Sequence, residues 1–241
     1  SDKAILQDAT TDVLVIGAGG SGMAAAIEAT NQGAKVILIE KQPNVGGTTL
    51  FSTTSFTAGG SKQQMAAPKP FTAEDFYKKL LVEFPGAERS GPTIDWLINL
   101  GADLTKVINN SQHVSPSGKA LGTIVVPTLK KEVDRLGIDT RTQTKAVDLI
   151  TKDGKVIGAV VETPKGKYKI FADSVILSTG GFASNPELVA KYTPQWAGYP
   201  STASRGSTGD GLLMGMKVGG AISHMDVAGP QTVAYDTGNG A

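Results

Sequence analysis

A glycine loop near the start of the chain constrains the fold more than any other feature of this sequence. The loop, Gly17-Ala-Gly-Gly-Ser-Gly22, follows the apolar run Asp12–Ile16 and precedes the alanine-rich segment Ser21–Gln32. The run predicts a buried strand, and the alanine-rich segment predicts a helix. A second apolar run, Lys35–Ile39, ends in Glu40. Together these segments predict a β-α-β unit, in which a helix joins two parallel strands.

The spacing of these glycines matches G-x-G-x-x-G, a dinucleotide-binding pattern when it stands between a strand and a helix. The first glycine permits the tight turn, the second lets the backbone approach a pyrophosphate, and the third allows the helix to pack closely. The N–H groups at the helix start then face the phosphates. Glu40 stands where its carboxylate can accept hydrogen bonds from both adenosine ribose hydroxyls and repel a 2′-phosphate. These features favour NAD or FAD over NADP.

The segment after Glu40 bears on the choice between NAD and FAD. It carries a second glycine pair, Gly46-Gly47, followed by hydroxyl residues. FAD is longer than its adenosine half and needs a further stretch of chain along its ribityl and ring. Residues 42–70 show no sustained period, which predicts a long loop, and long loops in compact domains are often functional. This loop is placed to provide that stretch.

Composition argues against several other functions. The formal net charge is +1, so the chain offers no basic face for a nucleic acid, and it has no cysteine and two histidines. A thiolate site, a cysteine nucleophile and a metal centre of several histidines are therefore excluded. No apolar stretch is long enough for a spanning helix, and no signal peptide is visible. We expect a soluble protein without a membrane span, either cytoplasmic or exported.

The remaining pattern predicts helices, then a meander, then a last strand. Helical spacing covers Thr72–Glu83, Pro92–Gly101 and Val126–Leu136. Strand patterns follow over residues 138–144 and in an antiparallel meander with turns at Asp153-Gly154 and Lys165-Gly166. A final buried strand, Ser174–Leu177, leads into Ser178-Thr-Gly-Gly181. His113 is expected in a loop, His224 is expected to be partly exposed after a helix, and Arg205 is expected to be a solvated loop charge.

Three segments, residues 11–49, 175–192 and 206–222, resemble the FAD-binding domain of the fumarate reductase/succinate dehydrogenase flavoprotein family. The soluble flavocytochrome c and urocanate reductase branch is the most similar. The resemblance implies an α/β, Rossmann-like FAD/NAD(P)-binding fold with a central parallel sheet, flanking helices and an antiparallel β-meander. It implies one FAD-binding domain over residues 1–241. Its parts are a β-α-β core (11–41), a flavin-side loop (42–70), a helical insert (71–136), the meander (143–172), a final strand and helices (173–224) and a tail (225–241).

The resemblance also implies the residues that contact FAD. Gly17, Ala18, Gly19, Gly20, Ser21 and Gly22 are implied at the pyrophosphate, Glu40 and Lys41 at the adenosine ribose, and Gly46, Gly47, Thr48, Thr49, Thr54 and Ser55 on the flavin side. Val147 is implied at the adenine, and Thr179, Gly180, Gly181 and Asp210 make further contacts; Asp210 reads equally well as a carboxylate at a helix start. Residues 42–60 contain no histidine, so noncovalent FAD is expected.

The chain departs from the family pattern in several places. Thr53–Ala58 stands where relatives carry a glycine pair with a nearby asparagine, Val82–Gly91 is shorter than in relatives, and Gly229–Val233 replaces a His-Pro-Thr. Nothing corresponds to the substrate-clamping domain, the catalytic arginine or a later glycine-rich flavin segment. We therefore expect a chain truncated before that domain, with its catalytic residues unknown.

The function that the resemblance implies is the FAD-binding portion of an oxidoreductase. The whole enzyme would reduce the activated C=C bond of a small unsaturated acid such as fumarate or urocanate, with an unknown electron donor. No paired carboxylates and no serine–histidine pair stand at hydrolytic spacing. Two alternatives remain open: an FAD-binding module without turnover, and a flavin enzyme acting on another enone such as a ketosteroid.

Overall fold

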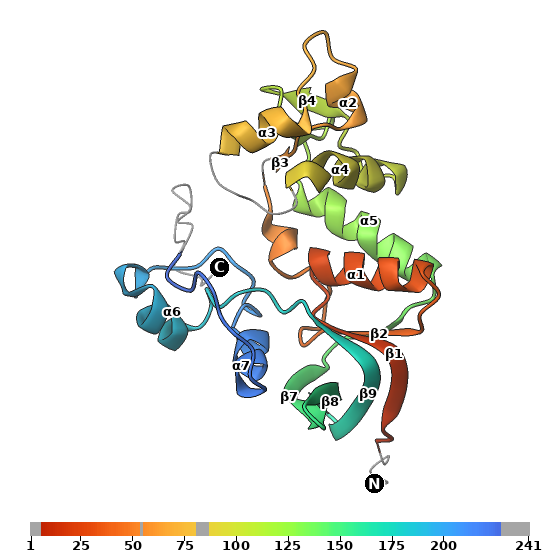
Figure 1. Cartoon of the computed structure of the whole chain (residues 1–241), viewed down its shortest axis with the longest axis vertical. Coiled ribbons are helices and arrows are strands. Elements are labelled where there is room, and N and C mark those ends of the chain that lie inside the picture. Colours follow the sequence, from red (N-terminus) through yellow and green to blue (C-terminus); the bar gives the residue numbers. More distant parts are fainter. Residues whose placement is uncertain (1–5, 54, 81–86, 228–241) are drawn as a thin grey trace. The chain divides into compact units, whose positions relative to one another are not determined.

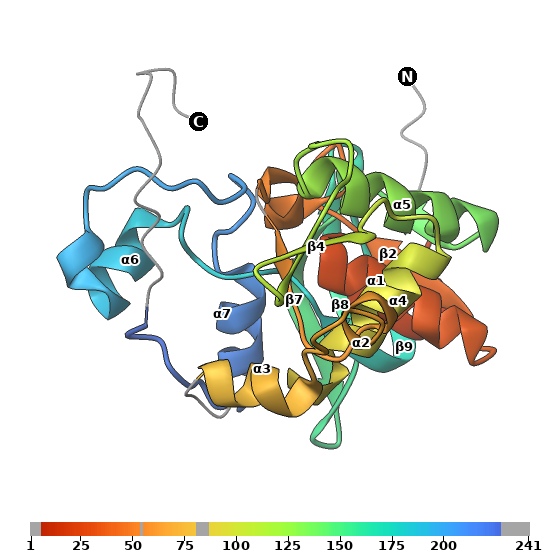
Figure 2. The same cartoon turned by 90° about the horizontal axis from the view of Figure 1, so that it is seen from above.

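The computed structural model describes residues 6–53, 55–80 and 87–227. Figures 1 and 2 show the helices and strands from two directions. The chain divides into two compact units, one made of residues 1–51 and 133–241 and the other of residues 52–132. The first unit is therefore discontinuous in sequence, with the second inserted into it. The sequence predicted one FAD-binding domain over residues 1–241 with six parts, and that division stays a prediction.

The first unit is built on a six-stranded sheet with the strand order β6-β2-β1-β9-β8-β7. The strands are β1 (Ala9–Ile16), β2 (Val36–Ile39), β6 (Asp139–Arg141), β7 (Lys145–Lys152), β8 (Lys155–Thr163) and β9 (Gly166–Leu177). Adjacent strands among β6, β2, β1 and β9 run parallel, while β9, β8 and β7 form an antiparallel meander. This sheet confirms the α/β fold predicted from the sequence.

The strand β9 is longer than the sequence pattern predicts. We expected a meander strand ending near Ala172 and a separate strand, Ser174–Leu177, but the structure has one continuous strand, Gly166–Leu177. β9 pairs antiparallel with β8 in its first part and parallel with β1 from Ile170 onward. Asp173 interrupts the apolar pattern without ending the strand, because successive strand residues face opposite sides and its side chain is exposed. β9 thus joins the meander to the parallel half of the sheet.

The predicted β-α-β unit consists of β1, α1 (Gly20–Asn31) and β2. Leu14 and Ile16 of β1 and Ile37 and Ile39 of β2 are buried in the core around the sheet. Each such side chain contributes roughly 1.5–3 kcal/mol by leaving water. All four residues of β2 and Leu14–Ile16 of β1 are buried, so both faces of the sheet are covered at these strands.

The chain continues after β9 through α6 (Pro186–Tyr192), the 3-10 turn η3 (Pro194–Trp196) and α7 (Asp210–Lys217). α7 contacts the edge strand β7, where Lys217 Nζ lies 2.9 Å from Asp148 Oδ2. The ion pair is solvent-exposed, so it contributes little to stability. It does mark the side of the sheet that α7 covers.

The second unit contains a small antiparallel sheet with the order β3-β5-β4. Its elements are β3 (Phe56–Thr57), α2 (Lys62–Met65), α3 (Ala73–Leu80), η2 (Ala87–Arg89), α4 (Ser90–Asn99), β4 (Lys106–Ile108), β5 (Gln112–Val114) and most of α5 (Gly122–Arg135). The helices expected at residues 72–83, 92–101 and 126–136 correspond to α3, α4 and α5. α5 begins earlier than predicted, and residues 81–83 lie outside the described residues.

His113 is fully buried in the central strand of this small sheet, although the sequence pattern places it in a loop. Its Nδ1 lies 2.9 Å from the Leu104 carbonyl oxygen, which can only accept, so Nδ1 carries the proton. Nε2 then accepts from Ser61 Oγ at 2.9 Å, and Ser61 Oγ accepts from Gln64 N at 3.2 Å. Both ring nitrogens are therefore used inside the second unit.

We expect the His113 ring to stay neutral to a lower pH than an exposed histidine does. Burial lowers the pKa of His113 and outweighs the Leu104 carbonyl and Asp95, which raise it. The unfolded pKa is about 6.5, so the stabilisation is complete above that pH. It is lost as the pH falls through the folded pKa, by at most about 1.4 kcal/mol per pH unit.

An NMR titration of the histidine ring carbons measures this pKa directly. The chain has two histidines, so a His224→Gln variant assigns the two signals. His224 is exposed and stands outside the helices and strands, which makes the substitution mild. A titration midpoint for His113 at or above about 6.5 would contradict the prediction.

Within the described part of the chain, no helix is long and apolar enough to cross a membrane. The longest helix there, α5, has 14 residues, against the roughly 20 that a spanning helix needs. Among the same residues, no three His, Asp or Glu side chains come together as the ligands of a metal ion would.

Candidate functional site

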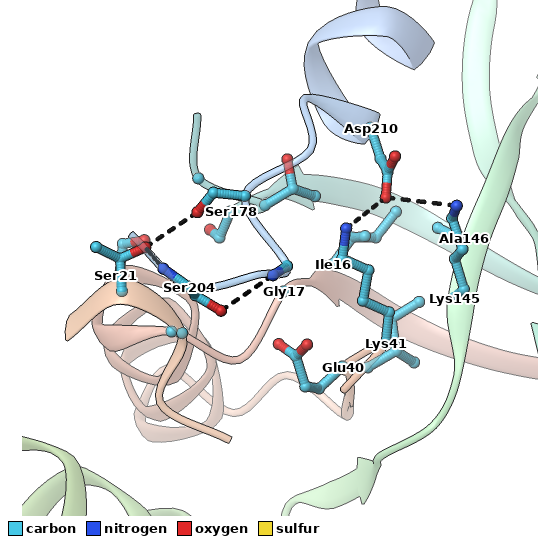
Figure 3. Close-up of a pocket in the computed structure, with 18 of the residues that line it drawn as sticks. Ile16, Gly17, Ser21, Glu40, Lys41, Lys145, Ala146, Ser178, Ser204 and Asp210 are labelled. Carbon is cyan, nitrogen blue, oxygen red and sulfur yellow. Dashed lines mark hydrogen bonds and ion pairs between the residues drawn. The ribbon is translucent and has the colours of Figure 1, made fainter. Parts of the chain in front are cut away.

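A groove opens in the first unit where three parallel strands end at the same edge of the sheet. Gly17 follows β1, Glu40 follows β2 and Ser178 follows β9. Ligands of open α/β sheets bind at this edge. The groove encloses about 130 Å³, and Figure 3 shows many of its residues. It is lined by Ile16, Gly17, Gly19, Gly20, Ser21, Ile39, Glu40, Lys41, Gly47, Thr48, Thr49, Thr144, Lys145, Ala146, Ser178, Thr179, Gly180, Ser204, Gly206, Ser207, Asp210 and Met214.

The glycine loop forms one wall of the groove and has no room for side chains at two positions. Gly17 has φ +102°, and a Cβ there would collide with the Ser178 carbonyl. A Cβ on Gly22 would collide with the Gly17 carbonyl, so α1 begins tight against the loop. Gly19 is the N-cap of α1 and has no side chain to accept from the first-turn N–H groups. This end of α1 is therefore suited to an anion.

The second glycine pair lies against this loop. Gly46 pairs with Gly19 in a single parallel bridge, and its N–H donates to the Ala18 carbonyl at 2.8 Å. The following 3-10 turn, η1 (Gly47–Phe51), contains Thr49, whose Oγ1 accepts from Gly20 N at 3.1 Å. The loop after β2 is thus held against the start of α1.

The Glu40 side chain is buried at the end of β2. Its Oε2 accepts from Ala18 N at 2.9 Å, and its Oε1 accepts from Gln42 N at 2.8 Å. A carboxylate offers about four lone-pair sites, so each oxygen keeps one that is free for a further donor. Glu40 can therefore shape the glycine loop and still accept two hydroxyl groups in the groove.

Two lysines and an aspartate meet on another side of the groove, as the dashed lines in Figure 3 show. Asp210 Oδ2 lies 2.7 Å from Lys41 Nζ and 3.7 Å from Lys145 Nζ. Burial raises the pKa of Asp210, but the hydrogen bond and charge of Lys41, the charge of Lys145 and a hydrogen bond from Thr208 outweigh it and lower the pKa overall. Asp210 is therefore a carboxylate at neutral pH, and it stands at the start of α7.

The structure brings most of the predicted cofactor residues to this groove. Those that line it are Gly17, Gly19, Gly20, Ser21, Glu40, Lys41, Gly47, Thr48, Thr49, Thr179, Gly180 and Asp210. The described residues Ala18, Gly22, Gly46, Val147 and Gly181 do not line it. Ser55 belongs to the second unit. Thr54, residues 229–233 and part of the segment 82–91 lie outside the described residues.

Two of the residues off the groove still shape its surroundings. Gly22 permits the contact between α1 and the loop. Val147 stands at an irregularity in the pairing of β7 with β8, and its neighbour Ala146 lines the groove. The glycine loop and the start of β7 are therefore both at the groove, although Ala146 and not Val147 lines it.

Some groove residues were not predicted from the sequence. Ser178 directly precedes the predicted Thr179, and Thr144, Lys145 and Ala146 directly precede Val147, so a wider window would have included them. Ser204, Gly206 and Ser207 carry a weaker signal, a serine- and glycine-rich stretch before Thr208. Ser204 and Ser207 are held in the groove by hydrogen bonds to Thr48, which stands more than 150 residues earlier in the sequence.

Comparison with protein families matches residues 12–232 to one family, described as FAD binding domain. The chain is 37% identical over 234 residues to the fumarate reductase (cytochrome) of Shewanella frigidimarina, covering 90% of this chain and 41% of that protein. A solved structure, the open conformation of a flavocytochrome c3 fumarate reductase, matches at 35% identity and a TM-score of 0.80. That match covers 88% of this chain and 41% of the other.

A second solved structure shares the fold. The 3-ketosteroid-delta4-(5alpha)-dehydrogenase of Rhodococcus jostii RHA1 matches with a TM-score of 0.81 at 23% identity, covering 92% of this chain and 56% of that one. At that identity the similarity is one of fold alone. The chain spans 41% of the length of the fumarate reductase that it matches.

Proposed function

The chain belongs to the FAD binding domain family, and from this premise we propose that the groove at the ends of β1, β2 and β9 is its FAD site. The observation that carries the proposal is the cradle at the start of α1, where a Cβ on Gly17 or Gly22 would collide with backbone. Such a loop brings backbone N–H groups close to a phosphate without side chains in between. The buried Glu40 carboxylate beside it fits the ribose. The chain's own residues therefore fit the group that the family binds.

We assign these residues the following roles in the proposal. Gly17, Ala18, Gly19, Gly20, Ser21 and Gly22 form the pyrophosphate loop, Glu40 and Lys41 the ribose region, and Gly46, Gly47, Thr48, Thr49, Thr54 and Ser55 the flavin side. Val147 offers its backbone to the adenine, and Thr179, Gly180, Gly181 and Asp210 complete the site.

The proposed attachment of FAD is noncovalent. Residues 42–60, which form most of the predicted flavin-side loop, include no histidine to form a histidyl bond. Denaturing the loaded chain in acid should then release all of the flavin into the supernatant. Flavin that stays with the precipitated protein would contradict this part of the proposal.

For the whole protein we propose reduction of the activated C=C bond of a small unsaturated acid such as fumarate. FAD, when bound, supplies hydride transfer. This chain's residues hold and orient the cofactor, and none of them is assigned a catalytic role. The identity of 37% to a fumarate reductase supports the proposal.

Two measurements test these proposals. The purified chain, incubated with FAD and passed through a desalting column, should be yellow and show a flavin absorption spectrum. A chain that stays colourless after reconstitution would overturn the FAD site itself. The oxidation of a reduced viologen dye on addition of fumarate then tests turnover. We expect little or none from this chain alone, and a binding module without turnover gives the same result, so the dye assay is decisive only with the full-length protein.

A further inference from the structure

We propose that Lys41 is a positioning residue that fastens residues 204–210 across the groove and thereby sets how fast FAD leaves. We call residues 204–210 the strap. The inference rests on the proposed FAD site, but the fastening itself is a property of the chain without cofactor. Ser204, Gly206, Ser207 and Asp210 of the strap all line the groove.

The first fastening is at Lys41. Its Nζ donates to Thr208 Oγ1 at 2.6 Å and to Asp210 Oδ2 at 2.7 Å. Thr208 Oγ1 in turn donates to Asp210 Oδ1 at 3.1 Å, which closes a triangle of three polar groups. The Lys41 and Asp210 side chains are each 21% exposed, so water competes with these bonds only in part. Charge-assisted bonds in such surroundings are stronger than a surface ion pair.

The stem of Lys41 also lies against the strap. A Cβ built on Gly206 would lie 3.3 Å from Lys41 Cε, which is tighter than an ordinary contact. The glycine therefore lets the strap come down onto the lysine side chain. Lys41 follows Glu40, so the strap is attached directly beside the proposed ribose site.

The second fastening is at Thr48. Its Oγ1 accepts from Ser204 N at 3.1 Å and lies 3.0 Å from Ser207 Oγ. Lys41 and Thr48 stand on either side of the loop that follows β2. The strap is thus fixed at two points to the segment that follows β2. The contacts of Thr48 are polar and uncharged, and those of Lys41 are charged.

The strap holds its own shape between these points. Ser207 N donates to the Ser204 carbonyl at 2.8 Å, and Thr208 N donates to the Gly206 carbonyl at 2.9 Å. Ser184 bonds to both ends of this turn, with its N–H on the Ser207 carbonyl and its hydroxyl on the Ser204 carbonyl at 2.9 Å each. A preformed turn of this kind moves as a body, so breaking one fastening weakens the hold on all of it.

The groove is small, and this bears on how the strap affects the entry and release of FAD. The groove encloses about 130 Å³, whereas pockets for drug-sized ligands have roughly 300–1,000 Å³. Four strap residues line a groove of this size, so in the proposal the strap shifts when a whole dinucleotide enters or leaves. Loss of the Lys41 fastening should therefore raise the rate at which FAD leaves and should not slow its entry.

The variant Lys41→Met tests this inference because it keeps the stem and removes the charge. We expect FAD to leave the variant about tenfold faster than the wild type, measured as the rise of flavin fluorescence after dilution. The matched control is Lys217→Met, which breaks an ion pair of 2.9 Å outside the groove and should leave the release rate unchanged. The wild-type release rate should also rise with ionic strength more steeply than that of Lys41→Met.

Hydrogen exchange of the cofactor-free chain gives a second readout that does not depend on FAD. The Ser204 amide, which donates to Thr48 Oγ1 outside the strap, should exchange about tenfold faster in Lys41→Met than in the wild type and should be unchanged in Lys217→Met. Unchanged exchange in Lys41→Met would overturn the strap. If exchange rises and the wild type binds no FAD, the FAD site fails while the fastening stands. If FAD leaves Lys41→Met faster while the exchange of Ser204 stays as in the wild type, Lys41 acts only by direct contact with the cofactor and the proposed role is wrong.

Discussion

Replacing Gly22 with alanine is expected to weaken FAD binding by about tenfold to a hundredfold, because overpacking costs roughly 1–3 kcal/mol. The added Cβ would collide with the Gly17 carbonyl oxygen, which is backbone and cannot rotate away. Either α1 or the loop must shift, and either shift moves the first-turn N–H groups from the phosphates. A titration of FAD followed by quenching of its fluorescence measures the change in affinity.

A suitable control for this substitution is Gly215→Ala in α7. A Cβ there would lie 3.6 Å from Leu177 Cδ1, an ordinary contact, and Gly215 is not among the groove residues. Alanine also favours the helix. Circular dichroism and thermal unfolding show whether Gly22→Ala still folds. A folded Gly22→Ala with wild-type affinity would contradict the role given to the start of α1.

The β-α-β unit and its loop could be predicted because their information is local. The run before Gly17, the alanines after Gly22 and the glutamate at the end of the second run each follow from a few adjacent residues. The structure places all of them as expected, with Glu40 buried beside Ala18. Short-range pattern is sufficient where a strand is buried on both faces and a tight turn demands glycine.

The strap and the position of His113 could not be predicted, because the contacts that fix them are not local in the sequence. Thr48 and Ser204 are separated by 156 residues, and no local pattern records that they bond. His113 stands in a three-residue strand whose partners, β3 and β4, have only two and three residues, so the sequence could show no periodicity there. The contacts of both features are tertiary, and such contacts override local preference.

Glu40 provides the second large effect that we expect. Glu40→Ala should weaken FAD binding by about tenfold to a hundredfold, since a buried donor left without its acceptor costs roughly 1–3 kcal/mol. That donor is Ala18 N, which Glu40 Oε2 accepts at 2.9 Å. The substitution also removes the acceptors proposed for the ribose hydroxyls. A fall in affinity alone does not separate these two causes.

ADP and 2′,3′-dideoxy-ADP separate them, because they differ only in the ribose hydroxyls. Each oxygen of Glu40 already accepts one backbone N–H, from Ala18 or Gln42, and retains one site. The wild type should therefore prefer ADP by at least about tenfold as a competitor of FAD, since even one hydrogen bond to a charged group contributes roughly 1.5–3 kcal/mol. Glu40→Ala should bind both competitors weakly and equally. If it keeps the wild-type preference, the hydroxyls are bound elsewhere and Glu40 acts on the loop alone.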